Sequence, residues 1–193
     1  MKRRYPLEWN KNTILKILED LDQYFSKQDE SVEALVIGGV AIVLQNFQSR
    51  STNDLDLAPV SGADRLLKAC EKLNIPAQFV SLTSTVDFNA VEKIVLYEGK
   101  SLTLYSVSPT DLIRLKLERF RKHDPEDIYA IIKKKQMVFE NFETLACEGA
   151  TNFVGRTNEY ILSAQIVVER MYPNHLDDFK SHVIAWRLTH AHS

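Results

Sequence analysis

The sequence has few cysteines and no long apolar run. Cys70 and Cys147 are the only cysteines among 193 residues, too few for the disulfide framework of a small secreted domain. The longest apolar run, 34–44, includes two glycines and is too short to cross a bilayer. No apolar signal core follows the basic amino terminus. We therefore expect a reduced, cytoplasmic protein that does not associate with a membrane.

Net charge is also nearly absent, because 24 Lys+Arg oppose 26 Asp+Glu and leave a formal charge of −2. Together with a hydrophobic content of 45%, this excludes a disordered chain and argues against a general nucleic-acid coat protein. The overall balance hides a local asymmetry, however, because the stretch 114–135 holds 8 basic and 4 acidic residues. Such a stretch indicates either a solvated helix face or a local anion-binding surface.

Apolar periodicity predicts an α/β (α+β) fold, with a small mixed sheet, flanking helices and a helical carboxy-terminal lobe. The domains are expected at 1–107 and 108–193, with a soft boundary and with site residues contributed from 108–135. The predicted helices cover 10–27, 40–47, 61–73 (with Ser61 as N-cap), segments starting near 109 and 125, and most of the chain from 137 to 189. The predicted strands cover 34–37, 54–58, 78–82, and a hairpin of 91–97 with 101–107.

Gly38 and Gly39 are adjacent, where a buried strand meets a helix start. A backbone without Cβ atoms can approach a ligand closely there, and the amides of a following helix favour an anion. An ordinary strand–helix turn explains an isolated Gly-Gly pair equally well.

Asp54 and Asp56 alternate with Leu55 and Leu57, so in a strand the two carboxylates share one face. Their Cα atoms would lie ~6.6 Å apart, from a rise of ~3.3 Å per residue. Two carboxylates repel unless a cation lies between them, and Mg²⁺ suits such oxygen ligands. The alternative is the exposed face of an edge strand. With Gly38-Gly39, the pair predicts metal-assisted phosphoryl or nucleotidyl transfer.

At this point the sequence resembles a known family. Gly38-Gly39 followed by Asp54-x-Asp56 resembles the signature of the polymerase-beta-like nucleotidyltransferase superfamily. The string 50–57, with its Arg-x-Thr-x-Asp-hydrophobic-Asp pattern, resembles the bacterial subgroup related to AbiEii-type toxins. The segments 111–117 and 123–128 resemble that subgroup's Lys-Leu helix and its Arg-Asp-x-x-Asp segment, with His123 in place of the arginine.

The resemblance implies a role for each matching residue. Asp54 and Asp56 would bind Mg²⁺ and be catalytic, and Asp127 would be part of the active site. The residues implied in binding the nucleotide are Gly38, Gly39, Arg50, Thr52 and Lys116. Polymerizing members of the superfamily use a third carboxylate, for which Asp87, Glu92 and Glu98 are candidates.

Structural explanations compete with these roles. Asp127 could cap the helix that starts near Pro125, because a carboxylate there meets unpaired amides. Lys116 could be a solvated lysine, and Arg50 could be a loop charge, a counter-charge to Asp54 and Asp56, or a phosphate ligand.

The predicted function is Mg²⁺-dependent transfer of a nucleoside monophosphate from an NTP to a hydroxyl of RNA, with a tRNA end as one candidate, or of a protein. The resemblance adds a toxin role with a cognate antitoxin as partner. The alternatives are a catalytically inactive nucleotide- or protein-binding module of the same fold, and a metal-dependent phosphohydrolase.

Overall fold

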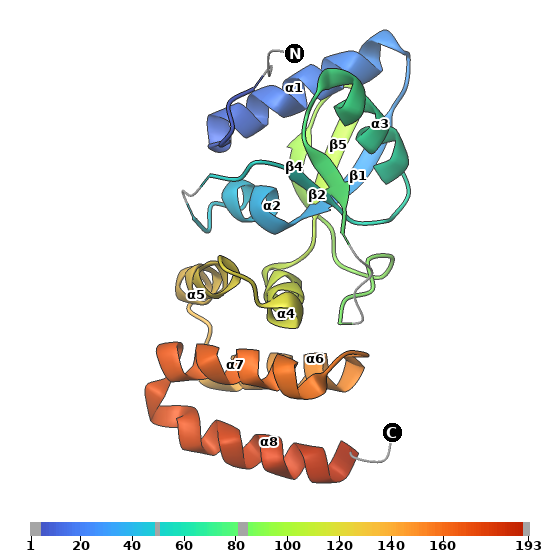
Figure 1. Cartoon of the computed structure of the whole chain (residues 1–193). Coiled ribbons are helices and arrows are strands. Elements are labelled where there is room, and N and C mark those ends of the chain that lie inside the picture. Colours follow the sequence, from blue (N-terminus) through green and yellow to red (C-terminus); the bar gives the residue numbers. More distant parts are fainter. Residues whose placement is uncertain (1–4, 49–50, 81–84, 191–193) are drawn as a thin grey trace. The chain divides into compact units, whose positions relative to one another are not determined.

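The computed structural model describes residues 5–48, 51–80 and 85–190, with side chains described as far as residue 186 (Figure 1). Its internal contacts divide the chain into two compact units. The first contains the described residues up to 80 together with 88–108, and the second contains 85–87 together with the chain from Pro109 onward. Each unit is described by itself.

The first unit is a mixed sheet with three helices. Its elements are α1 (Lys11–Lys27), β1 (Val32–Ile37), α2 (Gly38–Leu44), β2 (Leu55–Leu57), α3 (Ala63–Leu73), β3 (Ala77–Phe79), β4 (Ile94–Glu98) and β5 (Leu102–Ser106). The strand order is β3-β2-β1-β5-β4. β1 pairs antiparallel with β2 and parallel with β5, β2 pairs parallel with β3, and β4 with β5 forms the predicted antiparallel hairpin. The predicted α/β class with a small mixed sheet is confirmed.

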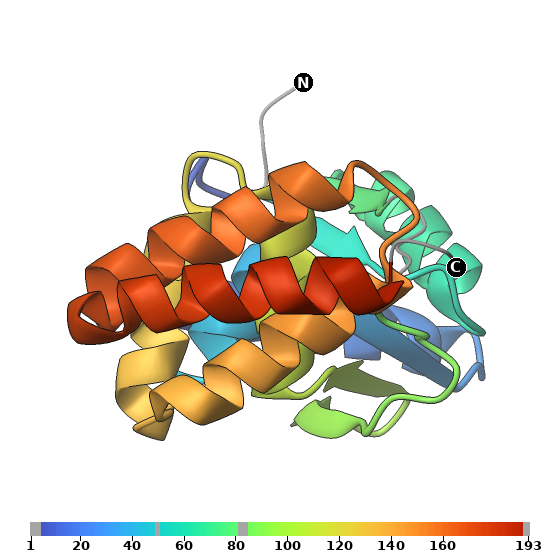
Figure 2. The ribbon, with the colours of Figure 1, turned by 90° about the horizontal axis from the view of Figure 1, so that it is seen from below.

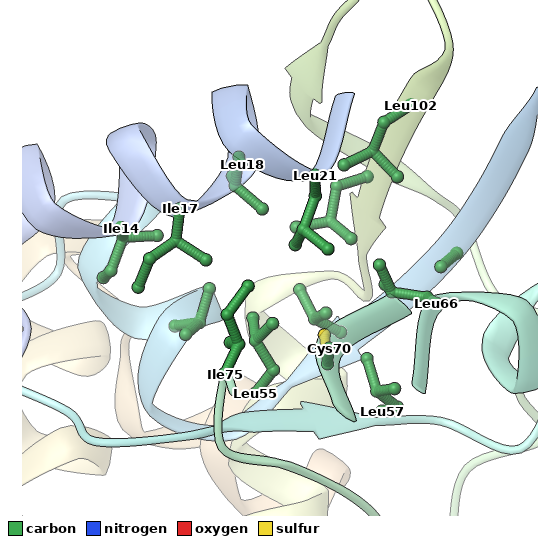
Figure 3. Close-up of a cluster of buried hydrophobic side chains, with 14 of the residues drawn as sticks. Ile14, Ile17, Leu18, Leu21, Leu55, Leu57, Leu66, Cys70, Ile75 and Leu102 are labelled. Atoms are coloured by element: carbon green, nitrogen blue, oxygen red, sulfur yellow. The ribbon is translucent and has the colours of Figure 1, made fainter. Parts of the chain in front are cut away.

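One face of this sheet carries the hydrophobic core, because alternate strand residues point to it. Leu55 and Leu57 of β2 and Leu102 of β5 meet apolar residues of α1 and α3, including Leu21 and Leu66 (Figure 3). Burying each such leucine stabilises the fold by roughly 1.5–3 kcal/mol. Cys70 lies in the same cluster, as predicted, and burial raises the pKa of its thiol to about 12.

Three local predictions were wrong in detail. Ser61 does not cap α3: the N-cap is Gly62 at φ +85°, where a Cβ would overlap the carbonyl oxygen of Glu33. α2 begins at Gly38 itself rather than after the glycines. β2 covers only Leu55–Leu57, so Asp54 lies one residue before the strand.

The second unit is helical. It consists of α4 (Pro109–Arg119), α5 (Asp124–Lys135), α6 (Phe139–Asn152), α7 (Thr157–Met171), the short 3₁₀ turn η1 (Pro173–His175) and α8 (Leu176–His190). α7 contacts α4, α5, α6 and α8, and Figure 2 shows α7 (orange) beside α8 (red). Phe142, Tyr160 and Phe179 are among its most deeply buried side chains. The helical character predicted from residue 109 onward is confirmed. Within the described residues, every helix falls short of the length and apolarity that crossing a membrane requires.

Candidate active site

Gly38 and Asp56 come together where β1 ends. Asp56 of β2 pairs with Ile37, the last residue of β1, and Gly38 follows directly. Gly38 adopts φ +69°, a left-handed conformation in which side chains are disfavoured. A Cβ on Gly38 would overlap Oδ2 of Asp56. Glycine is therefore required here both by the backbone conformation and by the carboxylate beside it, and the turn is more than an ordinary strand–helix connection.

Gly39 lies one residue further, in the first turn of α2, and all seven residues of that helix are buried. α2 contacts both β1 and β2, the strands that bring Gly38 and Asp56 together. Its role in phosphate binding stays a prediction.

Asp54 and Asp56 point to the same place, because one amide group binds both. Nε2 of Gln78 donates to Oδ2 of Asp54 at 3.1 Å and to Oδ1 of Asp56 at 2.9 Å. β2 lies between β3 and β1, and Asp56 is only 8% exposed. The alternative, in which the aspartates lie on the exposed face of an edge strand, is therefore wrong.

Gln78 was missed by the sequence analysis. It lies on β3 directly beside Asp56 in the strand register. The sequence signal for it is weak, since a single glutamine in a short apolar segment has no recognisable spacing to the aspartates. Its position became visible only when β3 paired parallel to β2.

The candidate third carboxylates belong to other segments of the chain. Glu98 is on β4, three strand spacings from β2, or roughly 14 Å at ~4.8 Å per spacing. Glu92 is exposed and precedes β4, while Asp87 belongs to the second unit. In the described part of the chain, no group of three or more His, Cys, Asp or Glu side chains is placed to hold a metal ion.

The donor set of Asp54 and Asp56 still fits a hard divalent cation. Carboxylate oxygens are the ligands that Mg²⁺ prefers, and Mg²⁺ commonly uses one or two of them and completes its shell with water and phosphate oxygens. Gln78 contributes a neutral amide, so it adds no charge of its own to the pair.

The residues upstream of β2 connect it to the amino-terminal segment. Thr52 is buried, and its backbone N–H and carbonyl exchange hydrogen bonds with Trp9 at 3.1 and 2.6 Å. This bridge positions the segment that leads to Asp54. Arg50 lies outside the described residues, so its predicted roles stay predictions.

Lys116 and Asp127 meet in the second unit, as part of a buried ion cluster. Lys116 is 2% exposed, and its Nζ donates to Asp127 at 2.6 Å and to Asp124 at 2.9 Å. Arg119 adds two hydrogen bonds to Asp124. Two positive charges thus balance two negative ones, and the solvated-lysine interpretation of Lys116 is wrong.

The cluster also changes the expected capping of α5. Asp124 is the first helical residue and His123 is the N-cap, with no side-chain capping bond. Burial by itself raises the pKa of Asp124, but the charges and hydrogen bonds of Lys116 and Arg119 outweigh it and hold that pKa below its usual value. Asp127 is fully buried against Lys116.

Several cations of the stretch 114–135 are already engaged. Arg114 pairs with Asp111 and Glu148, and Lys116 and Arg119 pair with carboxylates of α5. Lys133–Lys135, at the end of α5, are exposed. These pairings favour a structural role for the first part of the stretch.

The whole chain was compared with known proteins. A model of the family described as "Nucleotidyltransferase of unknown function (DUF6036)" matches residues 12–178. The chain belongs to this nucleotidyltransferase family. No curated protein and no solved structure matched the chain.

The family match spans both units, so it includes the Gly38–Asp56 site and the Lys116 cluster. It supports the nucleotidyltransferase superfamily and nucleotidyl transfer in general. The match does not extend to the AbiEii-related subgroup.

Proposed function

We propose that this nucleotidyltransferase transfers a nucleoside monophosphate from an NTP to a hydroxyl group of RNA or protein, using Mg²⁺. The observation that carries the proposal is the meeting of Gly38 with the Asp54–Asp56 pair in the first unit. The two carboxylates share one hydrogen-bond donor, so their oxygens are gathered at one place, and such oxygen ligands suit a divalent cation.

Each residue has a defined task in this proposal. Asp54 and Asp56 hold the cation, which when bound supplies charge stabilisation between triphosphate and acceptor. Gly38 leaves room for the Asp56 carboxylate, and the Gly38-Gly39 backbone is proposed to bind the phosphates. The acceptor oxygen bonds to the α-phosphorus, the bond to the bridging oxygen of the β-phosphate breaks, pyrophosphate leaves, and the hydroxyl proton passes to water.

The hydrogen bonds of Lys116 limit the role that the resemblance implied for it. The resemblance implied that Lys116 contacts the triphosphate and that Asp127 belongs to the active site. Two of the three N–H groups of Lys116 are donated to buried carboxylates. Any contact with phosphate would have to compete with these bonds.

A toxin role, with a cognate antitoxin as partner, is the finer part of the proposal. It is supported only by the resemblance of 50–57, 111–117 and 123–128 to the AbiEii-related subgroup. A test is expression of the chain in a growing bacterium, where growth arrest that disappears in Asp56→Asn supports it.

The second candidate is an inactive binding module of the same fold. Its supporting observation is that Asp54 and Asp56 have a glutamine, Gln78, as neighbour where a third acid could complete a metal site. This candidate keeps nucleotide or protein binding and lacks transfer.

The deciding experiment incubates the chain with each α-labelled NTP, Mg²⁺, total RNA and a protein extract. Transfer of label that is lost in Asp54→Asn and Asp56→Asn, but kept in Asp64→Asn on the exposed face of α3, supports the proposal. NTP binding by calorimetry without any transfer supports the inactive module. Release of inorganic phosphate in place of pyrophosphate supports a phosphohydrolase and overturns the proposal.

A further inference from the structure

Asp54 and Asp56 are held in place by different parts of the first unit. Asp56 lies inside β2, where it pairs with Ile37 of β1 on one side and with Gln78 of β3 on the other. Asp54 comes one residue before the strand, so the sheet register does not include it. Two ligands of one metal ion must keep their places to within about 0.5 Å. The position of Asp54 therefore depends on the segment that leads into β2.

An amino-terminal strap, residues 5–11, binds that segment two residues before Asp54. The N–H of Trp9 donates to the carbonyl of Thr52 at 2.6 Å, and the N–H of Thr52 donates to the carbonyl of Trp9 at 3.1 Å. Such a reciprocal pair is the repeating unit of an antiparallel ladder. It fixes both the position and the direction of the chain at Thr52.

Trp9 anchors the strap in the hydrophobic core. Its side chain is 1% exposed and belongs to the buried cluster that α1 shares with the sheet. The indole Nε1 donates to the carbonyl of Pro6 at 3.0 Å, and the hydroxyl of Tyr5 donates to Asp20 of α1 at 2.6 Å. The strap is thus attached to the core and to α1, and it carries that fixed position to Thr52.

The strap also contacts the other end of the connection between α2 and β2. Nζ of Lys11 donates to Oδ1 of Asn46 at 2.7 Å, just after α2 ends. Near β2, the hydroxyl of Ser51 donates to the carboxylate of Glu8 at 3.1 Å. α2 carries the glycine pair and β2 carries the buried aspartate. The strap therefore binds both described ends of the connection that joins the two parts of the proposed site.

We propose that Trp9 is a positioning residue for Asp54, a proposal that rests on the function proposed above. By holding Thr52, Trp9 keeps the Asp54 carboxylate at the place where it meets the Asp56 carboxylate and a shared cation. Asp56 does not depend on the strap, because β2 is paired on both sides at this residue. The strap thus acts on one ligand of the pair.

The test measures the Mn²⁺ affinity of the whole chain by electron paramagnetic resonance. Trp9→Ala is expected to weaken Mn²⁺ binding about tenfold, because losing a group that orients a metal ligand commonly has this effect. Trp9→Phe keeps a buried ring and should bind Mn²⁺ nearly as tightly as the parent. Glu8→Ala, at an exposed position, removes the bond from Ser51. It should weaken Mn²⁺ binding by a smaller factor, and it serves if Trp9→Ala does not fold.

The matched control is Phe25→Ala. Phe25 belongs to the same core cluster and is also 1% exposed, but it lies near the end of α1 that is farther from the strap. Its truncation should lower stability, read by urea denaturation, and leave the Mn²⁺ affinity unchanged. An equal loss of affinity in Phe25→Ala would show that any weakening of the core has this effect, which overturns the positioning role of Trp9.

Double variants identify the aspartate through which Trp9 acts. Trp9→Ala is combined with Asp54→Asn and, separately, with Asp56→Asn. Residues that act through one another are not additive, so the effect of Trp9→Ala on Mn²⁺ affinity should disappear beside Asp54→Asn and persist beside Asp56→Asn. Equal effects in the two backgrounds overturn the proposal.

The side-chain amide of Gln78 reports on Asp54 without any metal, because it donates to both carboxylates. In nuclear magnetic resonance spectra we expect Trp9→Ala to shift this amide signal as Asp54→Asn does. A parent chain that binds no Mn²⁺ contradicts the proposed function, and the amide signal alone then decides whether Trp9 positions Asp54. Mn²⁺ binding that requires Asp54 and Asp56 but is unchanged in Trp9→Ala overturns the positioning role and leaves the proposed transfer standing.

Discussion

The two units each bring a pair of aspartates together, but the pairs have different neighbours. In the helical unit, Asp124 and Asp127 are met by Lys116 and Arg119, so the cluster is neutral. In the sheet unit, Asp54 and Asp56 share one neutral amide. The helical pair is bound by side-chain cations of its own unit, whereas the sheet pair gathers its oxygens beside Gly38, an arrangement that suits a divalent cation.

The largest expected effect breaks the neutral cluster. Lys116→Met would remove the lysine that binds both buried carboxylates and leave Arg119 on Asp124, and we expect the free energy of unfolding to fall by about 3–5 kcal/mol. Urea denaturation measures the loss, and Lys122→Met, at an exposed loop lysine, is the control with little change. A Lys116→Met variant as stable as the parent would contradict the structural role of the cluster.

The next effect concerns the room beside Asp56. Gly38→Ala places a Cβ against Oδ2 of Asp56 and holds a non-glycine residue at φ +69°. We expect a loss of about 2–4 kcal/mol in unfolding free energy, read by thermal or urea denaturation. Gly39→Ala is the comparison, since its φ is not positive. Equal stability of Gly38→Ala and the parent would show that Asp56 does not lie against this turn.

A smaller effect sharpens the contrast in charge. Gln78→Glu adds a third acid next to Asp56, and we expect Mn²⁺ or Mg²⁺ to bind about tenfold more tightly, equivalent to about 1.4 kcal/mol. Calorimetry or electron paramagnetic resonance of Mn²⁺ reads the affinity directly. Gln28→Glu, at an exposed position after α1, is the control that should change nothing. An unchanged affinity in Gln78→Glu would place the cation away from this pair.

The smallest effect is a pH dependence of the helical unit. Because the folded-state pKa of Asp124 is lowered, its contribution to stability is present above the unfolded value near 3.8 and is lost as pH falls through the folded pKa. Unfolding free energy should therefore decrease in acid, and Asp124→Asn should reduce the slope. Denaturation curves between about pH 2 and 6, the range in which carboxylates titrate, test this prediction. Asp64→Asn is the control, and its slope of unfolding free energy against pH should match that of the parent.

Much of the fold could be predicted because its signals are local. The apolar periodicity of 10–27 predicted α1, and the Gly-containing turn between 97 and 101 predicted the β4–β5 hairpin. Helix starts were less certain, since a nearby Ser61 looked like a cap while the left-handed Gly62 takes that place. Choosing between them requires the contact of Gly62 with Glu33, which the local sequence does not contain.

The candidate site likewise has features that the local sequence predicts and features that depend on residues distant along the chain. The shared face of Asp54 and Asp56 was predicted from a period of two, although Asp54 lies just outside the strand. The burial of Lys116 between two carboxylates was not predicted, because an isolated lysine in a helix is usually solvated and its partners are 8 and 11 residues away. Gln78 could not be predicted, because strand pairing brings it to the aspartates from 22 and 24 residues away.

The sequence by itself therefore determined the class of fold, the glycine pair, the alternating aspartates and, through the family match, nucleotidyl transfer. Its scarcity of net charge remained ambiguous, since aspartates that pair with lysine and arginine and aspartates that lie beside a glycine turn contribute equally to a sum. Only the tertiary structure decided which was which, because the cost of a charge depends on burial and on partners that are distant along the chain. It placed Asp124 and Asp127 against Lys116 and Arg119, and it brought Asp56 beside Gly38 with the amide of Gln78 shared between Asp54 and Asp56.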